Sequence, residues 1–544
     1  MNTRQLQTDK NQKLYHALLG ILLVCALAMM MLLSYWACKY SYYGAVDGRT
    51  RGVLVGDKTW AHIAVFLAAS LCAMGIDKVL MKKDKSQQEK ICLCTLIVTS
   101  VIAFILGVFY VCKNPYYPVG DQINTTAFAA YCRDGNFSML SIGGYVGMYQ
   151  QQKGLAILYE ILFTLFGDFN YRPAKILHVV WWILTILAGY GFLKLNTDRP
   201  VFRMLYCVMM LGCFPLLFYL PYIYGDVLSI SFGIILFYGV AAYEHSGQKR
   251  YIALASFAAG LAVLARKNTW IVLVAVAVYV LLVSLRKKKV RYLMAGTAIL
   301  LTAALSVKAV DVIYEVRSGY PSGVGIPSIL WVAMGLQETE GRAGVYNRYQ
   351  QATFTDYDCQ QELAAQQGKE YIRERLEEFS QDPGMVFNFF KNKVEGQWIE
   401  PMYAALESTE SFEEGAELSP VLESLYYGEL GRTIWKLTNY YQSILYLAGL
   451  MALVMLGILW WKKKEVPISL WLPWIAVFGG FLFSILWEAK SRYVFPYCVF
   501  MILYAPEGLY QTGLLLCKLP KLRKFKKSGH TQDKGEEASL RETA

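Results

Sequence analysis

Charged residues are scarce in this chain: they make up 17% of its 544 residues, against 56% hydrophobic residues. Soluble domains carry about 25% charged residues, so the composition argues against an ordinary soluble protein. Apolar runs of about 18–24 residues recur along the sequence, and each can cross the roughly 30 Å hydrocarbon layer as a helix. The composition predicts an all-α polytopic membrane protein.

Patterns of metal ligands are also lacking. The five histidines and twelve cysteines are scattered, and Cys92-Leu93-Cys94 has the wrong spacing for a zinc site. No cofactor is predicted, and a divalent metal is not indicated. Cys112 and Cys132 flank one loop, and the spacing leaves open whether they pair or stay free. A small-x-small cleavage site is missing after 14–38, so we interpret that segment as a retained first span.

Acidic residues are fewer than basic ones, 41 against 53, which gives a formal charge of +12. In a soluble protein such a surplus can indicate a nucleic-acid partner. Here the basic residues cluster in short loops between apolar segments, as the positive-inside rule predicts for cytoplasmic loops. We therefore expect the lipid bilayer as a partner, no nucleic acid, and both termini in the cytoplasm.

About twelve transmembrane helices are predicted. They are residues 14–38, 60–77, 91–112, 173–194, 203–220, 227–243, 251–265, 269–285, 291–310, 436–460, 467–487 and 493–517. All the basic loops lie on the cytoplasmic side, as the positive-inside rule requires, only if residues 154–166 do not cross the membrane. This stretch is also short for a transmembrane span. We interpret it as an interfacial or re-entrant helix on the outer face.

Four regions follow from this topology. Residues 1–310 form a membrane core with an extracytoplasmic loop at 113–153, and residues 311–435 form a large extracytoplasmic loop. Residues 436–517 add the last transmembrane helices, and 518–544 form a basic, disordered cytoplasmic tail. Within the large loop, 360–379 is typical of a helix that Asp382-Pro383 ends before a second one.

Charged groups on the predicted outer face are the candidate functional residues. Charges inside or at the rim of a membrane are costly and are usually functional. Each has a structural alternative as well. Asp121 and Asp226 are suited to helix N-caps, the first for a helix starting near Thr125. Glu488, Lys490 and Arg492 can pair with one another at the rim, and Arg266 and Lys267 can be interfacial anchors.

Together these residues favour a phosphate-bearing amphiphile as substrate. Arginine and lysine hold phosphate and stabilise a departing phosphate group. Carboxylates can deprotonate or orient an acceptor hydroxyl, and Gln122 beside Asp121 can donate to a sugar or a carboxylate. Tyrosine and tryptophan, frequent near these positions, stack on sugars or lie at the headgroup level.

The order of four motifs resembles a known family. They are Asp121 after an apolar helix, Tyr149-Gln150-Gln151-Gln152-Lys153-Gly154-Leu155 before a Leu-rich helix ending Phe166-Gly167, the turn from Pro221 to Asp226, and Glu488-x-x-x-Arg492-Tyr493. This order resembles the GT-C superfamily of integral-membrane glycosyltransferases, specifically bacterial relatives of protein O-mannosyltransferases and of the lipid A aminoarabinose transferase. Segments 326–336 and 393–401 also resemble members from Gram-positive bacteria.

The resemblance implies a bacterial envelope glycosyltransferase in the cytoplasmic membrane, with a polyprenyl-phosphate sugar as donor and an envelope acceptor not identified by the sequence. It implies that Asp121 is the general base or orients the acceptor, with Asp226 and Glu488 as supporting carboxylates. Substrate-binding residues implied by the motifs and their neighbours are Tyr149, Lys153, Arg266, Lys267, Lys490, Arg492 and Tyr493. The chain departs from the family in lacking a proline pair before the Leu-rich helix and in having two further spans before Asp121.

Three alternatives remain open at this point. A secondary transporter predicts inverted repeats and interrupted spans near the midplane, whereas the sequence shows no internal repeat. A polysaccharide polymerase or ligase uses lipid-linked sugars and a large external loop as well. The third alternative is a purely structural partner in an envelope complex, in which the charged residues would have no catalytic or substrate-binding role.

Overall fold

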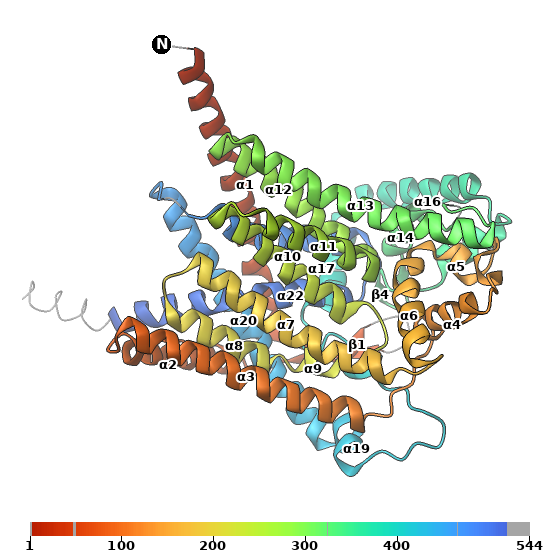
Figure 1. Ribbon diagram of the computed structural model, residues 1–544, viewed down its shortest axis with the longest axis horizontal. Helices are drawn as coiled ribbons and strands as arrows, with labels where there is room; N and C mark the ends of the chain where they lie inside the picture. The colour runs from red at the N-terminus through yellow and green to blue at the C-terminus, as the bar shows by residue number, and fades with distance from the viewer. Residues whose placement is uncertain (1–2, 47–50, 324, 465, 519–544) are drawn as a thin grey trace, which may run out of the picture.

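The protein is a helical bundle in a computed structural model that describes residues 3–46, 51–323, 325–464 and 466–518 (Figure 1). Within these residues, nine helices are long and apolar enough to cross a membrane. They are α1 (Thr3–Lys39), α2 (Thr59–Leu80), α3 (Lys85–Lys113), α7 (Arg172–Asn196), α10 (Asp226–Ser246), α12 (Trp270–Lys287) with η3 (Lys267–Thr269) before it, α13 (Val290–Ser318), α20 (Glu429–Trp461), and α21 (Leu472–Leu486) with η4 (Ile468–Trp471) before it. The all-α, multi-pass class is confirmed.

The other three predicted spans lie on helices that are short or interrupted. Span 203–220 consists of α8 (Pro200–Gly212) and α9 (Phe214–Phe218), which Cys213 separates just before Pro215. Span 251–265 is α11 (Lys249–Ala265). Span 493–517 begins in α22 (Ser491–Met501), and a turn at 502–504 divides it from a helical segment at 505–518. The count of twelve therefore remains a prediction.

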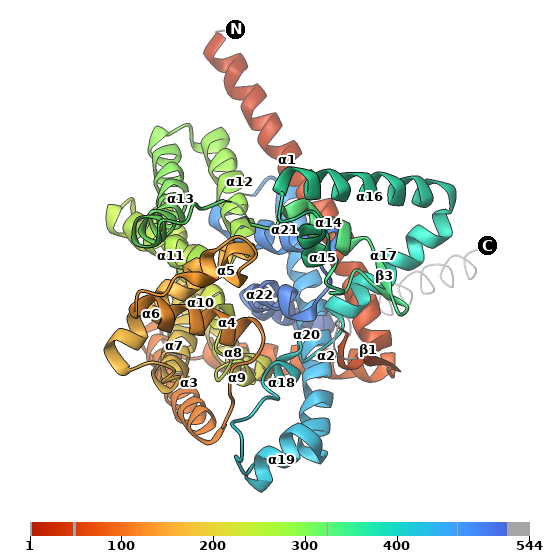
Figure 2. The same cartoon turned by 90° about the vertical axis from the view of Figure 1, so that its right-hand side faces the viewer.

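Helix α10 lies at the centre of the bundle, with 83% of its apolar window buried. It packs on α7 and α11, and α22 lies beside it near the middle of the end-on view (Figure 2). A helix that is apolar all round is expected at such an enclosed position. The beginnings of α10 and α22 thereby bring Asp226 and Arg492 near one another.

Short helices cover one end of the bundle, on the right in Figure 1. They are α4 (Asp121–Arg133), η1 (Ser138–Leu140), α5 (Tyr145–Met148), η2 (Gln150–Gln152) and α6 (Lys153–Phe166). The expected non-spanning segment is indeed a helix, α6, which packs against α4, α11 and α13. Its position at a membrane interface stays a prediction.

The large loop region is mostly helical. It contains α14 (Ser328–Gly335), β3 (Glu338–Thr339), β4 (Arg342–Ala343), α15 (Tyr349–Asp356), α16 (Gln361–Gln381), α17 (Pro383–Trp398), α18 (Ala405–Ser408) and α19 (Pro420–Tyr427). The predicted break is confirmed: Asp382 accepts hydrogen bonds from the Gly384 and Met385 amides and starts α17. Helices α13 and α20 extend into the predicted loop 311–435, since α13 continues to Ser318 and α20 begins at Glu429.

A β-hairpin that the sequence did not predict follows α1. Its strands are β1 (Tyr40–Val46) and β2 (Arg51–Gly56). The Tyr42 amide donates to the Ile399 carbonyl, and Trp435 Nε1 donates to the Tyr42 carbonyl. The hairpin thus joins the end of α17 to the start of α20.

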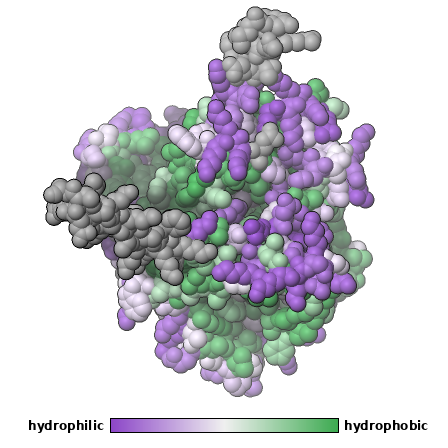
Figure 3. Space-filling model, turned by 90° about the vertical axis from the view of Figure 1, so that its left-hand side faces the viewer, coloured by the Kyte–Doolittle hydropathy of each residue, from purple (hydrophilic) through white to green (hydrophobic). Residues whose placement is uncertain are grey.

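Basic connectors lie at the opposite end of the bundle, where Figure 3 shows hydrophilic patches next to apolar surface. Ion pairs join several of them. Arg203 and Lys194 pair with Glu89 at 2.6 and 3.1 Å. Arg199 pairs with Asp77 at 3.1 Å. Such contacts tie neighbouring connectors together. The predicted tail reaches Lys518 within the described residues, and its remainder, 519–544, lies outside them.

Candidate active site

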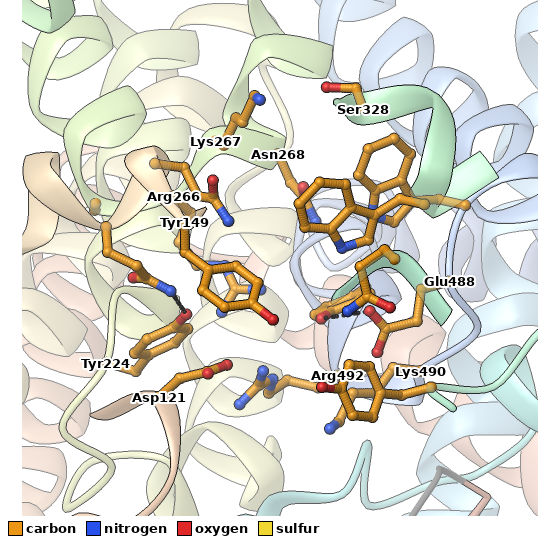
Figure 4. Close-up of a pocket in the computed structure, with 18 residues that line it drawn as sticks. Asp121, Tyr149, Tyr224, Arg266, Lys267, Asn268, Ser328, Glu488, Lys490 and Arg492 are labelled. Carbon is orange, nitrogen blue, oxygen red and sulfur yellow. Dashed lines mark hydrogen bonds between the residues drawn. The ribbon is translucent and has the colours of Figure 1, made fainter. Parts of the chain in front are cut away.

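A cavity of about 190 Å³ opens beneath the short helices, and eight of the ten predicted site residues line it (Figure 4). These eight are Asp121, Tyr149, Arg266, Lys267, Glu488, Lys490, Arg492 and Tyr493. They come from the start of α4, the turn before α6, the α11–α12 connection and the α21–α22 connection. Segments far apart in the sequence therefore meet around this cavity, which we call the chamber.

Asp121 is held by a rigid backbone turn. Gly120 has a φ of 59°, a left-handed conformation that glycine adopts at little cost. Asp121 is the first residue of α4, so the expectation of a helix starting near Thr125 was wrong, and no side chain caps this helix. Its carboxylate accepts a hydrogen bond from Tyr145 Oη at 2.9 Å. Burial, together with this carboxylate, raises the pKa of Tyr145, so the phenol stays a donor.

Gln122 was expected to donate to a sugar or a carboxylate, but its side chain bonds to two tyrosines instead. Its side chain is buried, accepts from Tyr116 Oη at 2.8 Å and donates to Tyr222 Oη at 2.6 Å. Lys175 donates to the Tyr116 carbonyl at 2.8 Å. These bonds fix the segment before α4 and leave Asp121 as the group that reaches the chamber.

Asp226 lies under the chamber rather than in its wall. Its carboxylate pairs with Arg266 at 2.7 Å, and Arg492 Nε approaches it to 4.0 Å. It is not an N-cap: the cap residue of α10 is Gly225, and there is no side-chain cap bond. A Cβ on Gly225 would lie 2.0 Å from the Ala265 carbonyl oxygen. Glycine is thus required where α10 meets the end of α11, and this contact brings Asp226 to Arg266.

Glu488 lies in extended chain between α21 and α22, so it does not share a helical face with Arg492. Ala489 donates its amide to the Gly344 carbonyl at 2.7 Å, and Tyr493 Oη donates to Glu488 at 3.4 Å. Lys393, buried beneath, donates to the Gly335 carbonyl. The loop region therefore shapes this wall of the cavity.

Lys153 does not line the chamber. It is buried, pairs with Asp311 at 2.5 Å and donates to Gln150 and Ser322. It lines a neighbouring cavity of about 290 Å³. The lysine therefore ties α6 to α13.

Aromatic rings that the sequence analysis did not assign to the site line one side of the chamber. Trp331 stacks on Trp487 with centroids 5.9 Å apart and planes at 5°, and Tyr149 meets Trp331 edge-on at 6.3 Å. Tyr224 and Tyr346 also line the cavity. Trp331 lies in segment 326–336, which carried the family resemblance, whereas no sequence signal marked Tyr346.

Positive charge dominates the chamber. Its lining includes four cationic side chains and two carboxylates, Asp121 and Glu488. Arg492 is 6% exposed, and its Nε is a buried donor without a hydrogen-bond partner among the described residues. Rings of Tyr222 and Tyr224 lie against its guanidinium. A buried donor of this kind is costly unless an acceptor arrives, so the arrangement suits an anionic ligand.

In the described part of the chain, no three His, Cys, Asp or Glu side chains group as a metal site would require. Cys112 and Cys132 are free thiols. No family model, curated protein or solved structure matches the chain.

Proposed function

We propose that this protein is a glycosyltransferase that moves a sugar from a polyprenyl-phosphate donor to an acceptor on the outer side of the cytoplasmic membrane. The observation that carries the proposal is the cavity in which Asp121 lies with Arg266, Lys267, Lys490 and Arg492. A carboxylate beside a surplus of cations is what transfer from a sugar phosphate requires.

An adjoining groove supports a lipid-linked donor. The 290 Å³ cavity has apolar walls from Val263, Leu264, Val307, Val310 and Ile326, near the ends of α11 and α13. Gln151, Lys267 and Ser328 line both this groove and the chamber. A prenyl chain in the groove would therefore place its phosphate beside Lys267.

The cations suit the leaving phosphate. During transfer, the bond between the sugar C1 and the phosphate oxygen breaks, and negative charge grows on that oxygen. Arg492 and Arg266 are held by packing and by Asp226, so they can stabilise this charge with little reorganisation. Polyprenyl phosphate then leaves through the groove.

Asp121 is suited to the acceptor side. The acceptor hydroxyl forms the new bond to C1, and its proton passes to the Asp121 carboxylate. In Figure 4, Asp121 and Glu488 lie on opposite sides of the cavity with Arg492 between them. This leaves the space between the carboxylates for the sugar, next to the tryptophan pair.

The test is the Asp121→Asn substitution in full-length protein reconstituted in nanodiscs. We expect release of polyprenyl phosphate from radiolabelled polyprenyl-phosphate sugars to fall at least about a hundredfold, the usual contribution of a general base. The control is Asp134→Asn, because Asp134 is an exposed carboxylate just after the other end of α4.

Full release by Asp121→Asn would remove Asp121 from the mechanism. Wild-type protein that consumes none of a panel of polyprenyl-phosphate sugars, in the presence of envelope extracts as acceptor, would contradict the glycosyltransferase itself.

A further inference from the structure

A third cavity, of about 570 Å³, borders Asp121 and shares no lining residue with the apolar groove. Its lining residues are Gly120, Asp121, Asn124, Tyr145, Tyr149, Tyr346, Asn347, Arg348 and Gln351. We call it the vestibule. Asp121, Tyr149 and Tyr346 line both the vestibule and the chamber, so the two cavities share one wall.

The vestibule differs chemically from the groove. None of its lining side chains is aliphatic, whereas the groove is rich in valine and leucine. Three tyrosines and three amides surround it. Phenol rings stack on sugar faces and amides pair with hydroxyl groups, but neither offers the apolar wall that a lipid chain needs.

Arg348 is the only cation in this lining. Its side chain is exposed, and within the described parts of the chain it takes part in no ion pair. Its φ of 69° is left-handed, a conformation that costs a non-glycine residue energy and persists only when the surroundings impose it.

The surroundings that impose this backbone are visible. Asn347 donates from Nδ2 to Gln337 Oε1 at 2.6 Å and to Thr339 Oγ1 at 3.1 Å. Asn347 Oδ1 accepts from the Tyr349 amide at 3.0 Å, at the start of α15. Arg348 is thus held at the vestibule by a fixed turn.

We propose that the vestibule binds the acceptor, and that the acceptor is an anionic polyol or glycan. This proposal rests on the proposed glycosyltransferase function. An acceptor hydroxyl faces Asp121, and a negative group on the next unit pairs with Arg348. Donor and acceptor then approach Asp121 from opposite sides, which matches the two different linings.

The test measures binding without any donor, by calorimetry on full-length protein in nanodiscs. The ligands are a short glycerol phosphate oligomer and an uncharged glycerol oligomer of the same length. We expect wild-type protein to bind the phosphate oligomer more tightly, and Arg348→Gln to weaken that binding at least about tenfold, as loss of a charge-assisted bond does. Binding of the uncharged oligomer should stay unchanged.

The matched control is Arg373→Gln, an exposed arginine of α16 that pairs with Glu377 and does not line the vestibule. A second variant, Gln351→Ala, should weaken binding of both oligomers, since its amide meets the hydroxyl groups. Both Arg348 and Gln351 are vestibule residues outside the buried core.

Equal affinity of wild type and Arg348→Gln for the phosphate oligomer, or no binding by wild type, would overturn the proposal. So would tighter, Arg348-dependent binding of an acidic peptide of equal charge, which would assign the vestibule to protein acceptors. Oligomer binding by a protein that never consumes polyprenyl-phosphate sugars would contradict the glycosyltransferase while leaving the anionic polyol site in place.

Discussion

At the scale of single residues, the two aspartates do different work. Asp121 is exposed and lines the chamber, and its carboxylate accepts a hydrogen bond from Tyr145 Oη. Asp226 is 2% exposed and lies between Arg266 and Arg492. The first is accessible from the chamber, while the second neutralises cations beneath it.

This difference predicts opposite effects on stability. Asp226→Asn leaves Arg266 buried without its carboxylate, so the free energy of unfolding should fall by about 3 kcal/mol. Asp121→Asn should change it by less than about 0.5 kcal/mol, as a surface substitution does. Thermal unfolding in detergent measures both, and equal losses would contradict the assignment.

Arg492 should act on the donor. Arg492→Ala removes a guanidinium from the chamber in which we propose that the donor phosphate binds, and we expect KM for the lipid-linked donor to rise more than KM for the acceptor. Steady-state kinetics with each substrate varied in turn measure this. Arg432→Ala, at an exposed arginine of α20, is the control. Equal effects on both substrates would indicate a structural rim pair instead.

At the scale of elements, close approaches of backbone set the geometry. Helix α10 can begin beside the end of α11 only because Gly225 has no side chain. The loop region reaches the α21–α22 connection in the same way, with Gly335 and Gly344 at the contact and Lys393 beneath them.

Gly225→Ala should therefore displace Asp226 from Arg266. The new Cβ would meet the Ala265 carbonyl at 2.0 Å, so one backbone must shift, and transfer activity and melting temperature should both fall. Gly75→Ala is the control, since nothing lies within 4 Å of a Cβ at that position of α2. A variant with wild-type activity would show that the contact does not set the site.

Lys393 should make stability depend on pH. Burial lowers its pKa from 10.5 to about 7, and Glu488 offsets part of this effect. Between these values the folded state binds fewer protons than the unfolded state, so stability rises as the pH increases from about 7 toward 10. Lys393→Met should remove that part of the rise in melting temperature, whereas Lys391→Met in the same helix should keep it.

At the scale of the whole molecule, the three cavities are neighbours that share lining residues. The apolar groove and the cationic chamber share Gln151, Lys267 and Ser328, and the chamber and the polar vestibule share Asp121, Tyr149 and Tyr346. All three lie at the end of the bundle opposite the basic connectors. The positive-inside rule then predicts that this end faces outward.

Cysteine labelling tests that orientation. In a protein whose native cysteines are replaced by serine, Ser138→Cys should react with an impermeant maleimide on intact cells, because Ser138 is exposed at the end that carries the cavities. Lys82→Cys, in the turn between α2 and α3, should react only after lysis. The reverse pattern would overturn the topology and the proposed side of reaction together.

Much of the fold could be predicted from sequence because helix length and apolar composition are local properties. The nine long apolar segments, the α16–α17 break at Asp382 and the short helix α6 follow from them. The β1–β2 hairpin was missed because its register depends on contacts with Ile399 and Trp435, which no local pattern records.

The sequence by itself determined the membrane class and most of the candidate residues, because charges stand out in an apolar chain. Tertiary structure alone decided which of them meet: it gathered Asp121 with Arg492, moved Lys153 to the groove and added the tryptophan pair. It also formed the vestibule, because only the fold brings Arg348, an ordinary surface arginine by sequence, into the same cavity lining as Asp121. Distances between remote segments depend on how the helices pack, and packing depends on contacts between distant parts of the chain that no single stretch of sequence specifies.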